Sequence, residues 1–385
     1  MIAGKILEVV PGESGEKVYK VKLSTGLEKS MDEETLARLL KSEWIGIPGL
    51  KVTSDNKIIT EASEIKLVDN IGEPMSADKC IGAFMGAIIG DAIGVPYEFF
   101  IAEEVPSYDL IGTTVPEGCN RTYPGIPVGT WSDDSSNILC LSKVLLEHKA
   151  VNGKALMMEL RAWYRDGRWA VNNHVFDIGD QTKEAIKEAE MGTPANQCGL
   201  VRPNGKGNGG LMRTLPVAIY FRGNRSEIVK AAHSQCIVTH GHPENGVCCA
   251  LYSLMVNEAL SGANKEDVIN NSLKFLRAFY KKFPRYLAIL DEINISTKST
   301  GEGSGYVTDA LKSVIMVFMR GESYLDTVKK AIILGNDTDT TACIAGGLAG
   351  AYYGFGNIPN EFKESWLKEY IPAAGMATQL YEAVK

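Results

Sequence analysis

The feature of this sequence that most constrains its fold is a row of glycines at four-residue spacing. In the segment KCIGAFMGAIIGDAIG, every fourth residue is glycine: Gly82, Gly86, Gly90 and Gly94. This spacing places the four glycines on one face of a helix. Each glycine inside a helix costs about 1 kcal/mol relative to alanine, so something must offset that cost. Close approach of a second helix is the natural candidate. The small-residue segment ACIAGGLAGAYYG at 342–354 predicts another closely packed helix.

Helical periodicity dominates the chain from Cys80 onward. Between 306 and 319, for example, apolar residues recur at three- and four-residue spacing, as in an amphipathic helix. Strand and helix patterns do not alternate, and no 20–50-residue repeat is present. Further helices are expected at 136–148, 154–165, 181–190, 226–238, 244–261, 265–283, 306–319 and 323–333. The sequence therefore predicts a mainly all-α catalytic domain over residues 78–385, with long functional loops.

The first 68 residues have a different pattern. Tyr19, Val21 and Leu23 alternate with lysines, which predicts a half-buried strand. Residues 32–40 resemble a short helix with an acidic first turn, and residues 49–63 predict two short strands around an Asp55–Asn56 turn. We therefore expect a small α+β N-terminal module at 1–68, of unknown role, and a linker at about 67–79.

Composition limits the kinds of partner and the compartment. The formal net charge of −7 makes nucleic acid an unlikely main partner. The eight cysteines form no C-x-x-C pair, which favours reduced thiols in the cytoplasm. The first residues hold too short an apolar run for a signal peptide, and no apolar stretch is expected to reach membrane-spanning length. A monomer is favoured, although no motif bears on the oligomeric state.

Two acidic clusters stand before apolar, helix-like runs at opposite ends of the helical region. They supply carboxylates and hydroxyls, namely Ser132, Asp133 and Asp134 in the first cluster and Asp337, Asp339 and Thr340 in the second. One interpretation is that these residues cap two unrelated helices. The other is that the clusters meet in space. Because neighbouring carboxylates disfavour one another's ionisation, two Mg²⁺ or Mn²⁺ ions would then be needed between them.

The segment GKGNGGLMR offers a candidate loop for binding phosphate. Glycines before a helix let backbone N–H groups approach a phosphate closely, and Asn208, Gly209 and Gly210 lie there. A simple glycine turn is the alternative. In THGHP, His240 and His242 lack a third soft ligand nearby, which disfavours zinc. A histidine that packs on a ligand is more credible, and a loop histidine without function is the alternative.

Other acidic residues lie near these motifs. Asp91 lies among small apolar residues, where an unpaired carboxylate would be costly, so a firm partner is expected. Asp177 and Asp180 precede a predicted helix, where either could be an N-cap, and Glu98 follows the glycine-rich helix.

Taken in order, the motifs GAFMGAIIGDAIGVPYEF, GTWSDDSS, FDIGDQT, GNGGLMR, THGHP and GNDTDTTACIAGGLAGAYYG resemble those of the ADP-ribosylglycohydrolase family. That family includes the dinitrogenase reductase-activating glycohydrolases. The resemblance covers residues 78–370. It implies a compact all-α fold, a centre with two Mg²⁺ or Mn²⁺ ions, and hydrolysis of the glycosidic bond between ADP-ribose and an acceptor.

The resemblance also implies roles for individual residues. The implied metal ligands are Ser132, where relatives usually have Thr, with Asp133, Asp134, Asp337, Asp339 and Thr340. The implied catalytic carboxylates are Asp134, Asp177 and Glu98, and the choice of general base among them stays open. The implied substrate-binding residues are Asn208, Gly209, Gly210, Met212, His240 and Tyr306. Asp180 stands where relatives often have Asn.

The implied substrate is an ADP-ribosylated protein, most naturally modified on arginine, or a small ADP-ribosyl compound. Two alternatives stay open. One is a metal-dependent hydrolase of another ribosyl or phosphate substrate. The other is a non-catalytic binding or structural protein, since relatives of the family include a lens crystallin. The intact acidic motifs argue against the second alternative.

Overall fold

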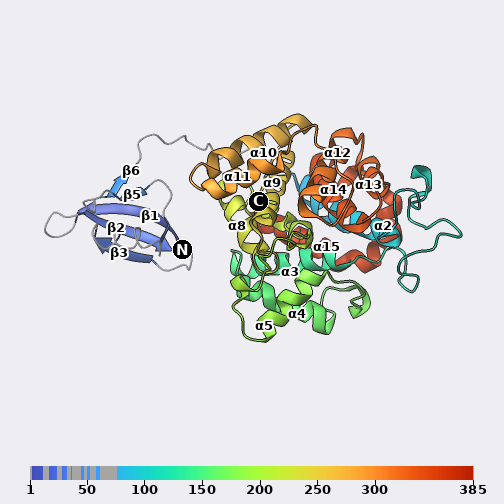
Figure 1. The fold of residues 1–385 in the computed structure, drawn as a ribbon, viewed down its shortest axis with the longest axis horizontal. Coiled ribbons are helices and arrows are strands. Elements are labelled where there is room, and N and C mark those ends of the chain that lie inside the picture. Colours follow the sequence, from blue (N-terminus) through green and yellow to red (C-terminus); the bar gives the residue numbers. More distant parts are fainter. Residues whose placement is uncertain are drawn as a thin grey trace. The chain divides into compact units, whose positions relative to one another are not determined.

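The structure is a computed structural model that describes residues 2–11, 17–23, 28–32, 36, 45–46, 50–52, 58–60 and 76–384. Of the described residues before 61 other than Tyr19 and Leu36, and of 365–371, it describes the backbone alone. The chain divides into two compact units, Met1–Val68 and Asp69–Lys385 (Figure 1). Each unit is described by itself below.

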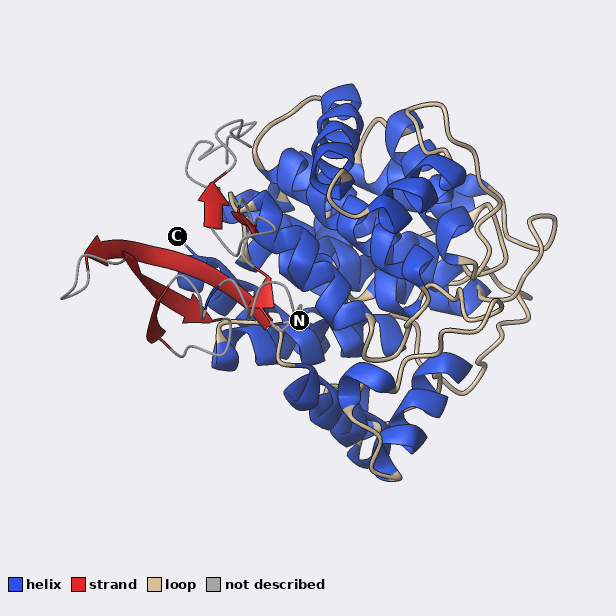
Figure 2. Ribbon diagram, turned by 60° about the vertical axis from the view of Figure 1, so that its left-hand side comes forward, coloured by secondary structure: helices blue, strands red, loops and turns tan. Residues whose placement is uncertain are grey.

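The N-terminal unit is built on two small sheets, drawn in red in Figure 2. In the first, β2 (Lys17–Leu23) pairs antiparallel with β1 (Ile2–Pro11) and β3 (Glu28–Asp32), and β1 pairs parallel with β4 (Ile45–Gly46). The second sheet is the antiparallel pair β5 (Leu50–Val52) and β6 (Ile58–Thr60).

The predicted strand containing Tyr19 is confirmed as β2, and Tyr19 is buried. The two short strands of 49–63 are confirmed as β5 and β6, while the Asp55–Asn56 turn lies outside the described residues. Most of the helix expected at 32–40 also lies outside them. Strands β1, β3 and β4 were not predicted, and β1 pairs with the predicted strand β2 along most of its length.

The second unit is helical, as predicted (Figure 2). Its helices are α2 (Ala77–Gly94), α3 (Asp133–His148), α4 (Gly153–Asp166), α5 (Asp180–Glu190), α6 (Gly209–Met212), α7 (Leu215–Tyr220), α8 (Arg225–Cys236), α9 (Pro243–Leu260), α10 (Lys265–Tyr280), α11 (Pro284–Ile293), α12 (Val307–Arg320), α13 (Tyr324–Ile332), α14 (Thr338–Tyr353) and α15 (Asn360–Val384). Short 3₁₀ helices are η1 (Val95–Tyr97), η2 (Tyr108–Leu110), η3 (Val171–Asn173), η4 (Ala195–Gln197) and η5 (Phe355–Asn357).

The predicted helices end within about three residues of the observed ones. Two helices were not predicted, α11 and α15, and the helix-like run expected after the glycines at 207–210 is divided into α6 and α7. Helices α6 and α7 are too short for an apolar period to be read. The helix expected at 265–283 ends at Tyr280, and Pro284 begins α11, since proline suits the first position of a helix. Helix α15 continues through Pro372, a residue that usually breaks helices.

The glycine row of α2 packs against α14, as the sequence predicted. A Cβ atom added to Gly90 would lie 2.2 Å from the carbonyl oxygen of Ala342, so the two backbones are in direct contact there. The row ends at Gly94, where an added Cβ would lie 2.5 Å from the Cα of Asp339. The same close packing therefore brings the acidic start of α14 beside the end of α2.

Helix α9 lies in the core of the helical unit. Helix α9 is buried from Glu244 to Leu260, as expected for a central helix that is covered on all sides.

The span Ala77–Tyr97, which contains α2, is long and apolar enough to cross a membrane, with a mean hydropathy of 1.5. The expectation that no stretch reaches that length is therefore wrong. However, 94% of this span is buried inside the protein, which is the setting of a core helix.

Candidate active site

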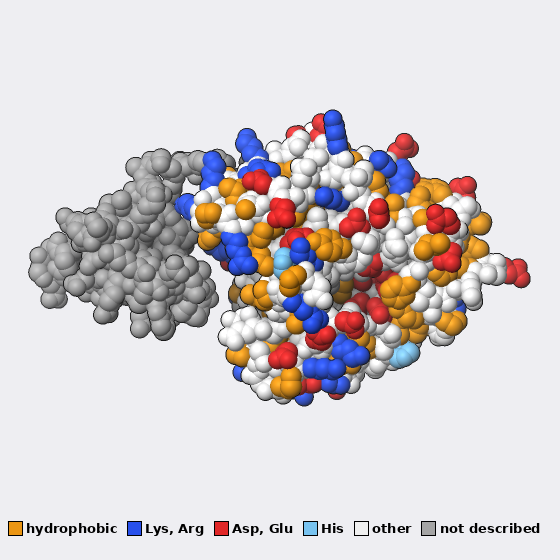
Figure 3. All heavy atoms as spheres, viewed as in Figure 1, with side chains coloured by type: hydrophobic (Ala, Val, Ile, Leu, Met, Phe, Trp, Pro, Cys, Tyr) orange, Lys and Arg blue, Asp and Glu red, His pale blue; other side chains and the backbone are white. Residues whose placement is uncertain are grey.

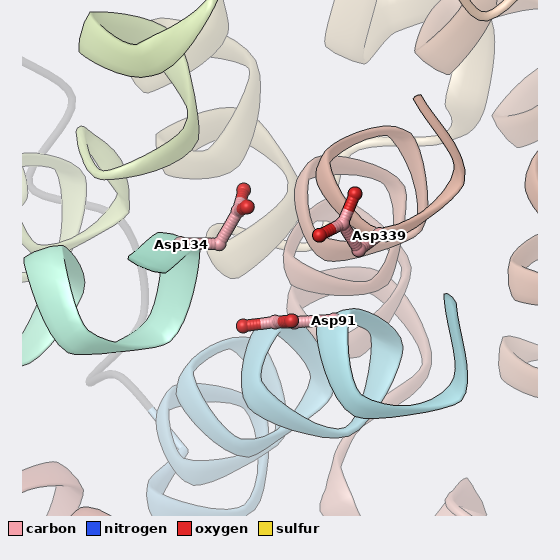
Figure 4. Close-up of side chains that lie close together, drawn as sticks. All are labelled: Asp91, Asp134 and Asp339. Atoms are coloured by element: carbon pink, nitrogen blue, oxygen red, sulfur yellow. The ribbon is translucent and has the colours of Figure 1, made fainter. Parts of the chain in front are cut away.

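Three buried aspartates from three helices point toward one another (Figure 4). Asp91 comes from the last turn of α2, Asp134 from the first turn of α3 and Asp339 from the first turn of α14. One carboxylate oxygen of each lies within 4.8 Å of the other two. This arrangement gives a compact set of oxygen donors of the kind that hard divalent cations prefer.

Asp91 has the firm partners that its buried position required. Its carboxylate accepts hydrogen bonds from the backbone N–H groups of Ser132 and Ser135, each at 3.0 Å, and from Ser135 Oγ at 2.5 Å. Burial raises the pKa of Asp91 to about 6, against the opposing effect of these hydrogen bonds. Asp91 therefore fixes the turn that presents the first acidic motif.

Asp134 is the residue at which the two acidic motifs meet. Its Oδ2 accepts hydrogen bonds from Ser132 Oγ and from Thr340 Oγ1, both at 3.1 Å. Its Oδ1 is buried and has no hydrogen-bond partner among the described residues. A buried carboxylate oxygen without a partner is costly, and a bound cation would satisfy it.

Helix capping does not account for these aspartates. The N-cap of α3 is Ser132, whose Oγ accepts a hydrogen bond from the N–H of Asp134. Asp337 occupies the N-cap position of α14, but its side chain makes no capping hydrogen bond. The carboxylates are therefore directed toward the shared acidic cluster instead of toward their own helix ends.

A second group of carboxylates shares Asp339 with the first. Glu98, which follows η1, and Asp177, in the loop before α5, each place an oxygen within 4.8 Å of Asp339 and of each other. The Tyr123 hydroxyl lies close to both Glu98 and Asp177 and favours their ionised forms, which lowers the pKa of each against the effect of burial. Glu98 is buried, and its Oε2 has no partner among the described residues. Burial, with repulsion from Asp177 and Asp337, raises the pKa of Glu98 to about 9.

The remaining acidic residues complete the cluster. Asp133 Oδ2 accepts a hydrogen bond from the Gly179 N–H at 3.3 Å, and half-buried Asp337 accepts one from Asn208 Nδ2 at 2.8 Å. Burial first, and then repulsion among the carboxylates, raises the pKa of Asp133, Asp134 and Asp339 well above the usual range. Figure 3 shows acidic side chains gathered in a hollow of the molecular surface. Such a cluster can hold a metal ion, because a divalent cation would relieve the repulsion.

The glycine-rich loop lies beside this cluster. The N–H of Gly207 donates to Gln181 Oε1 at 2.7 Å, and the N–H of Asn208 donates to the Gly305 carbonyl at 3.1 Å. These two N–H groups are therefore occupied within the protein. The N–H groups of Gly209 and Gly210 have no acceptor among the described residues. Both of these glycines are also required by close packing, since an added Cβ on either would lie 2.8 Å from a neighbouring side chain.

His240 forms one wall of this loop. The side chain is buried, and its Nδ1 lies 2.7 Å from Thr239 Oγ1. Burial, with a smaller effect of Arg213, lowers the pKa of His240 to about 3, so the imidazole is neutral at physiological pH. His242 does not join it. It is the N-cap of α9, where its Nδ1 accepts from the Glu244 N–H at 3.3 Å.

The other expected substrate-binding residues lie on either side of the loop. Met212 is buried in α6. Tyr306 is 42% exposed, pairs with Gly207 through a backbone bridge, and accepts a hydrogen bond from Lys206 Nζ at 3.0 Å. Asp180 is exposed at the start of α5 and does not belong to either carboxylate group.

Three residues of the site were not assigned to it from the sequence. Asp91 was expected only to have a partner, yet it belongs to the first carboxylate group. Tyr123 comes from a loop position that carries no motif, whereas Gln181 lies within the FDIGDQT motif but was given no role there. The signal for Asp91 was present, because a carboxylate inside a glycine-rich apolar helix is costly unless a ligand or a polar partner meets it. The motif that contains Gln181 was likewise present, whereas Tyr123 had no such signal.

Known proteins resemble this chain over nearly all of its helical part. The family model for ADP-ribosylglycohydrolase matches residues 73–385. An ADP-ribosylarginine hydrolase, Tri1, of Pseudomonas putida is 32% identical over 288 residues, covering 74% of each chain. The Tri1 protein of Serratia proteamaculans is 29% identical over 316 residues, covering 81% of each chain.

A more distant relative and a solved structure agree with these matches. The ADP-ribosyl-[dinitrogen reductase] glycohydrolase of Rhodospirillum rubrum is 25% identical over 304 residues, covering 77% of this chain and 91% of its own. A solved ADP-ribosylglycohydrolase-related protein complex superposes with a TM-score of 0.65 at 27% identity, covering 80% of this chain and 99% of its own. The order of the motifs, the helical fold and these matches lead to one conclusion: the chain belongs to the ADP-ribosylglycohydrolase family of hydrolases.

Proposed function

We propose that this enzyme hydrolyses the N-glycosidic bond between ADP-ribose and an arginine side chain of a modified protein, and that it depends on two Mg²⁺ or Mn²⁺ ions. One observation supports this most strongly. Two carboxylate groups, from α2, α3, α14 and two loops, share Asp339 and lie beside a glycine-rich loop that contacts Asp337 through Asn208. Cations and an anionic ADP-ribose would therefore bind side by side.

The residues present fit divalent cations. The donors are carboxylates with the hydroxyls of Ser132 and Thr340 nearby, and Asp134 Oδ1 and Glu98 Oε2 are buried without a partner among the described residues. Asp91, Asp134 and Asp339 would hold one ion, and Glu98, Asp177 and Asp339 would hold the other. Asp133 and Asp337 complete the acidic surround. Bound divalent cations would neutralise these carboxylates and polarise hydroxyl or water oxygens beside them.

Among the candidate general bases, the local geometry favours Glu98. The reaction breaks the bond between the ribose anomeric carbon and the guanidine nitrogen and forms a bond from that carbon to a water oxygen. The water gives one proton to a carboxylate, and the departing guanidine nitrogen takes up one proton, so a guanidinium leaves and no net proton is released. Glu98 Oε2 is buried and has no hydrogen-bond partner among the described residues, and the Tyr123 hydroxyl lies close to the same side chain. Bound cations would offset the burial and the carboxylate repulsion that raise the pKa of Glu98, so that it would be ionised and able to accept that proton. Asp134 already accepts two hydroxyl hydrogen bonds.

The substrate would be positioned by the glycine-rich loop and its neighbours. Asn208, Gly209 and Gly210 would hold the diphosphate, while neutral His240 and half-exposed Tyr306 would line the rest of the ADP-ribose site. Met212 supports this loop from the core. Binding energy from the diphosphate would help to hold the anomeric carbon at the carboxylates.

Arginine as the acceptor is supported by the names of the relatives. Two are named ADP-ribosylarginine hydrolases, and the third is named for dinitrogen reductase. The acidic cluster also suits a cationic guanidinium near the scissile bond. We further propose that the enzyme works as a monomer in the cytoplasm, which agrees with the eight cysteines all being free thiols.

The test is a panel of peptides that carry ADP-ribose on arginine, serine, glutamate or cysteine. Free ADP-ribose is measured with Mg²⁺, with Mn²⁺ and with chelator. We expect release from the arginine linkage alone, and only with a divalent cation. Release from another linkage instead would overturn the acceptor assignment, and full activity in chelator would overturn the metal dependence. No release from any linkage would favour another ribosyl substrate or a non-catalytic role.

A further inference from the structure

The proposed site has an electrostatic problem. A cluster of seven carboxylates lies beside the loop where an anionic diphosphate would bind, namely Asp91, Glu98, Asp133, Asp134, Asp177, Asp337 and Asp339. Two bound divalent cations would offset only part of this charge, and they would lie among the carboxylates. The glycine-rich loop itself carries no charged side chain at 207–210. A source of positive potential is therefore needed behind the loop.

Arg213 lies directly behind it. The side chain is completely buried, and its Nη1 donates a hydrogen bond to the Gly209 carbonyl at 3.1 Å. The other two nitrogens of the guanidinium bind Gln235, with Nε donating to Oε1 and Nη2 to the backbone carbonyl, both at 2.9 Å. Gln235 is also buried, and its Nε2 donates to the Gly210 carbonyl at 2.9 Å. Both loop carbonyls are therefore turned toward buried donors.

These contacts satisfy the hydrogen bonds of Arg213 without neutralising its charge. All three acceptors are neutral oxygens, and no carboxylate forms an ion pair with Arg213 in the described part of the chain. Lys206, the other cation next to the loop, is different because its Nζ lies 2.7 Å from a carboxylate oxygen of Glu244. An arginine stays charged even when buried. Its field therefore extends beyond its contacts, and it reaches both His240 and Asp133.

We propose that Arg213 is a positioning residue for the diphosphate of the substrate: with Gln235 it holds the Gly209 and Gly210 carbonyls away from the ligand, and its unpaired charge makes the loop attractive to an anion. This inference rests on the proposed function, because it assumes that the loop receives the diphosphate. A buried and unpaired cation destabilises the folded protein, and a role in anion binding would account for its presence.

The experiment compares three variants of the full-length protein by calorimetric titration with ADP-ribose in the presence of Mg²⁺. Gln235→Glu keeps the acceptor for Arg213 Nε and supplies a carboxylate that neutralises the guanidinium. It also removes the Nε2 donor to the Gly210 carbonyl. Arg213→Lys keeps the positive charge but loses the planar guanidinium and its set of hydrogen bonds, and Arg213→Met loses both the charge and these hydrogen bonds. Arg202→Gln is the matched control, since Arg202 is exposed and already paired with Glu184.

We expect the dissociation constant for ADP-ribose to rise at least about tenfold in Gln235→Glu and Arg213→Met, the equivalent of about 1.4 kcal/mol. Arg213→Lys should stay within about threefold of the wild type, and Arg202→Gln within about twofold. With an ADP-ribosylarginine substrate, the loss in the first two variants should fall mainly on KM, with a smaller change in kcat.

Two outcomes would overturn the inference. One is unchanged ADP-ribose affinity in a folded Gln235→Glu variant. The other is an equal loss in Arg213→Lys and Gln235→Glu, which would indicate a role in shape instead of charge. If Arg213→Met does not fold, the comparison of Gln235→Glu with Arg213→Lys still shows whether the charge of Arg213 is needed for ADP-ribose binding. Failure of the proposed function is distinguishable, because the wild-type protein itself would then not bind ADP-ribose.

Discussion

Thr340 Oγ1 donates a hydrogen bond to Asp134 Oδ2 over 3.1 Å, which joins two residues that are 206 positions apart in the chain. The bond links the first turns of α3 and α14. Ser132, which belongs to the same motif as Asp134, donates to the same oxygen. The two hydroxyls therefore hold one side of the Asp134 carboxylate. Its other oxygen, Oδ1, is left buried and without a partner among the described residues. The contacts that join the two motifs therefore also leave one oxygen available for a ligand.

Asp134→Asn should separate activity from stability. Removing one charge from the cluster relieves repulsion, so the metal-free variant should melt at the same temperature as the wild type or higher. Turnover should fall by about a hundredfold or more, because the cation site loses a charged ligand. Calorimetric titration with Mg²⁺, thermal unfolding in chelator and ADP-ribose release would measure the three quantities.

Asp180→Asn is the matched control for that experiment. Asp180 is also an aspartate in the first turn of a helix, but it is exposed and outside both carboxylate groups. Its Mg²⁺ affinity and turnover should stay within about twofold of the wild type. Normal Mg²⁺ affinity in Asp134→Asn would contradict the assignment of this aspartate to a metal site.

Gly90→Ala should destabilise the protein by about 1–3 kcal/mol, because overpacking outweighs the gain in helix propensity. The new methyl group would lie 2.2 Å from the Ala342 carbonyl oxygen and would force α2 and α14 apart. Since Asp91 is the next residue, Mg²⁺ affinity should fall too. Chemical denaturation would measure the change in the free energy of unfolding.

Gly375→Ala provides the contrast within a helix. Gly375 lies in α15, and an added Cβ there meets no atom within 4 Å. This substitution should stabilise the protein by up to about 1 kcal/mol through helix propensity alone. If both substitutions had the same effect, close packing would not be the reason for the glycine row.

The glycine row shows why the helical fold could be predicted from the sequence. Four glycines on one face of a helix are costly unless a second helix packs closely against them, and the small residues at 342–354 supplied that partner. Helices with clear apolar periods were predicted because the period itself marks the face that packs on the core. Helix α15 was not predicted, because Pro372 ordinarily ends a helix and only the surrounding structure decides otherwise.

The candidate site could likewise be predicted from the sequence only in part. The sequence indicated which residues carry suitable oxygens, but it could not say which of them meet. Tyr123 contacts Glu98 and Asp177 only because a loop returns to them, and no local pattern records that. Arg213 ends the GNGGLMR motif, but the sequence assigned it no role. Its burial and its neutral partners are properties of the folded chain alone.

His240 should make the stability of the protein depend on acid. In the unfolded chain its imidazole gains a proton as the pH falls below about 6.5, whereas burial, with a smaller effect of Arg213, lowers the pKa of the folded imidazole to about 3. The unfolded state therefore binds more protons in this window, and stability is lost as the pH falls. At pH 4.5 the loss attributable to His240 should be about 2–3 kcal/mol.

The measurement compares the wild type with His240→Gln by chemical denaturation at pH 7 and pH 4.5, both in chelator. In chelator both proteins are free of metal, so the carboxylates titrate in the same way in each and their contribution cancels in the comparison. The variant should lose less stability than the wild type on acidification. His148→Gln, at an exposed position near the end of α3, should behave like the wild type. Equal acid sensitivity in wild type and His240→Gln would contradict the prediction.

The N-terminal module should be dispensable for the chemical step. The family match begins at residue 73, and both carboxylate groups and the glycine-rich loop lie within residues 91–339. A protein that starts at Ser76 should therefore cleave a small ADP-ribosylarginine substrate with kcat/KM within about threefold of the full-length chain. Its efficiency on an ADP-ribosylated protein should change if the module has a functional role.

The direction of that change would identify the role. A module that recruits the modified protein raises its effective concentration without altering the chemical step, so its removal should raise KM for the protein substrate alone. A module that covers the site would have the opposite effect, and removal should increase efficiency on large substrates. Equal efficiencies on both substrates would leave a passive appendage. A folded truncated protein that has lost cleavage of the small substrate would show that the module completes the active site, contrary to the separation into two units.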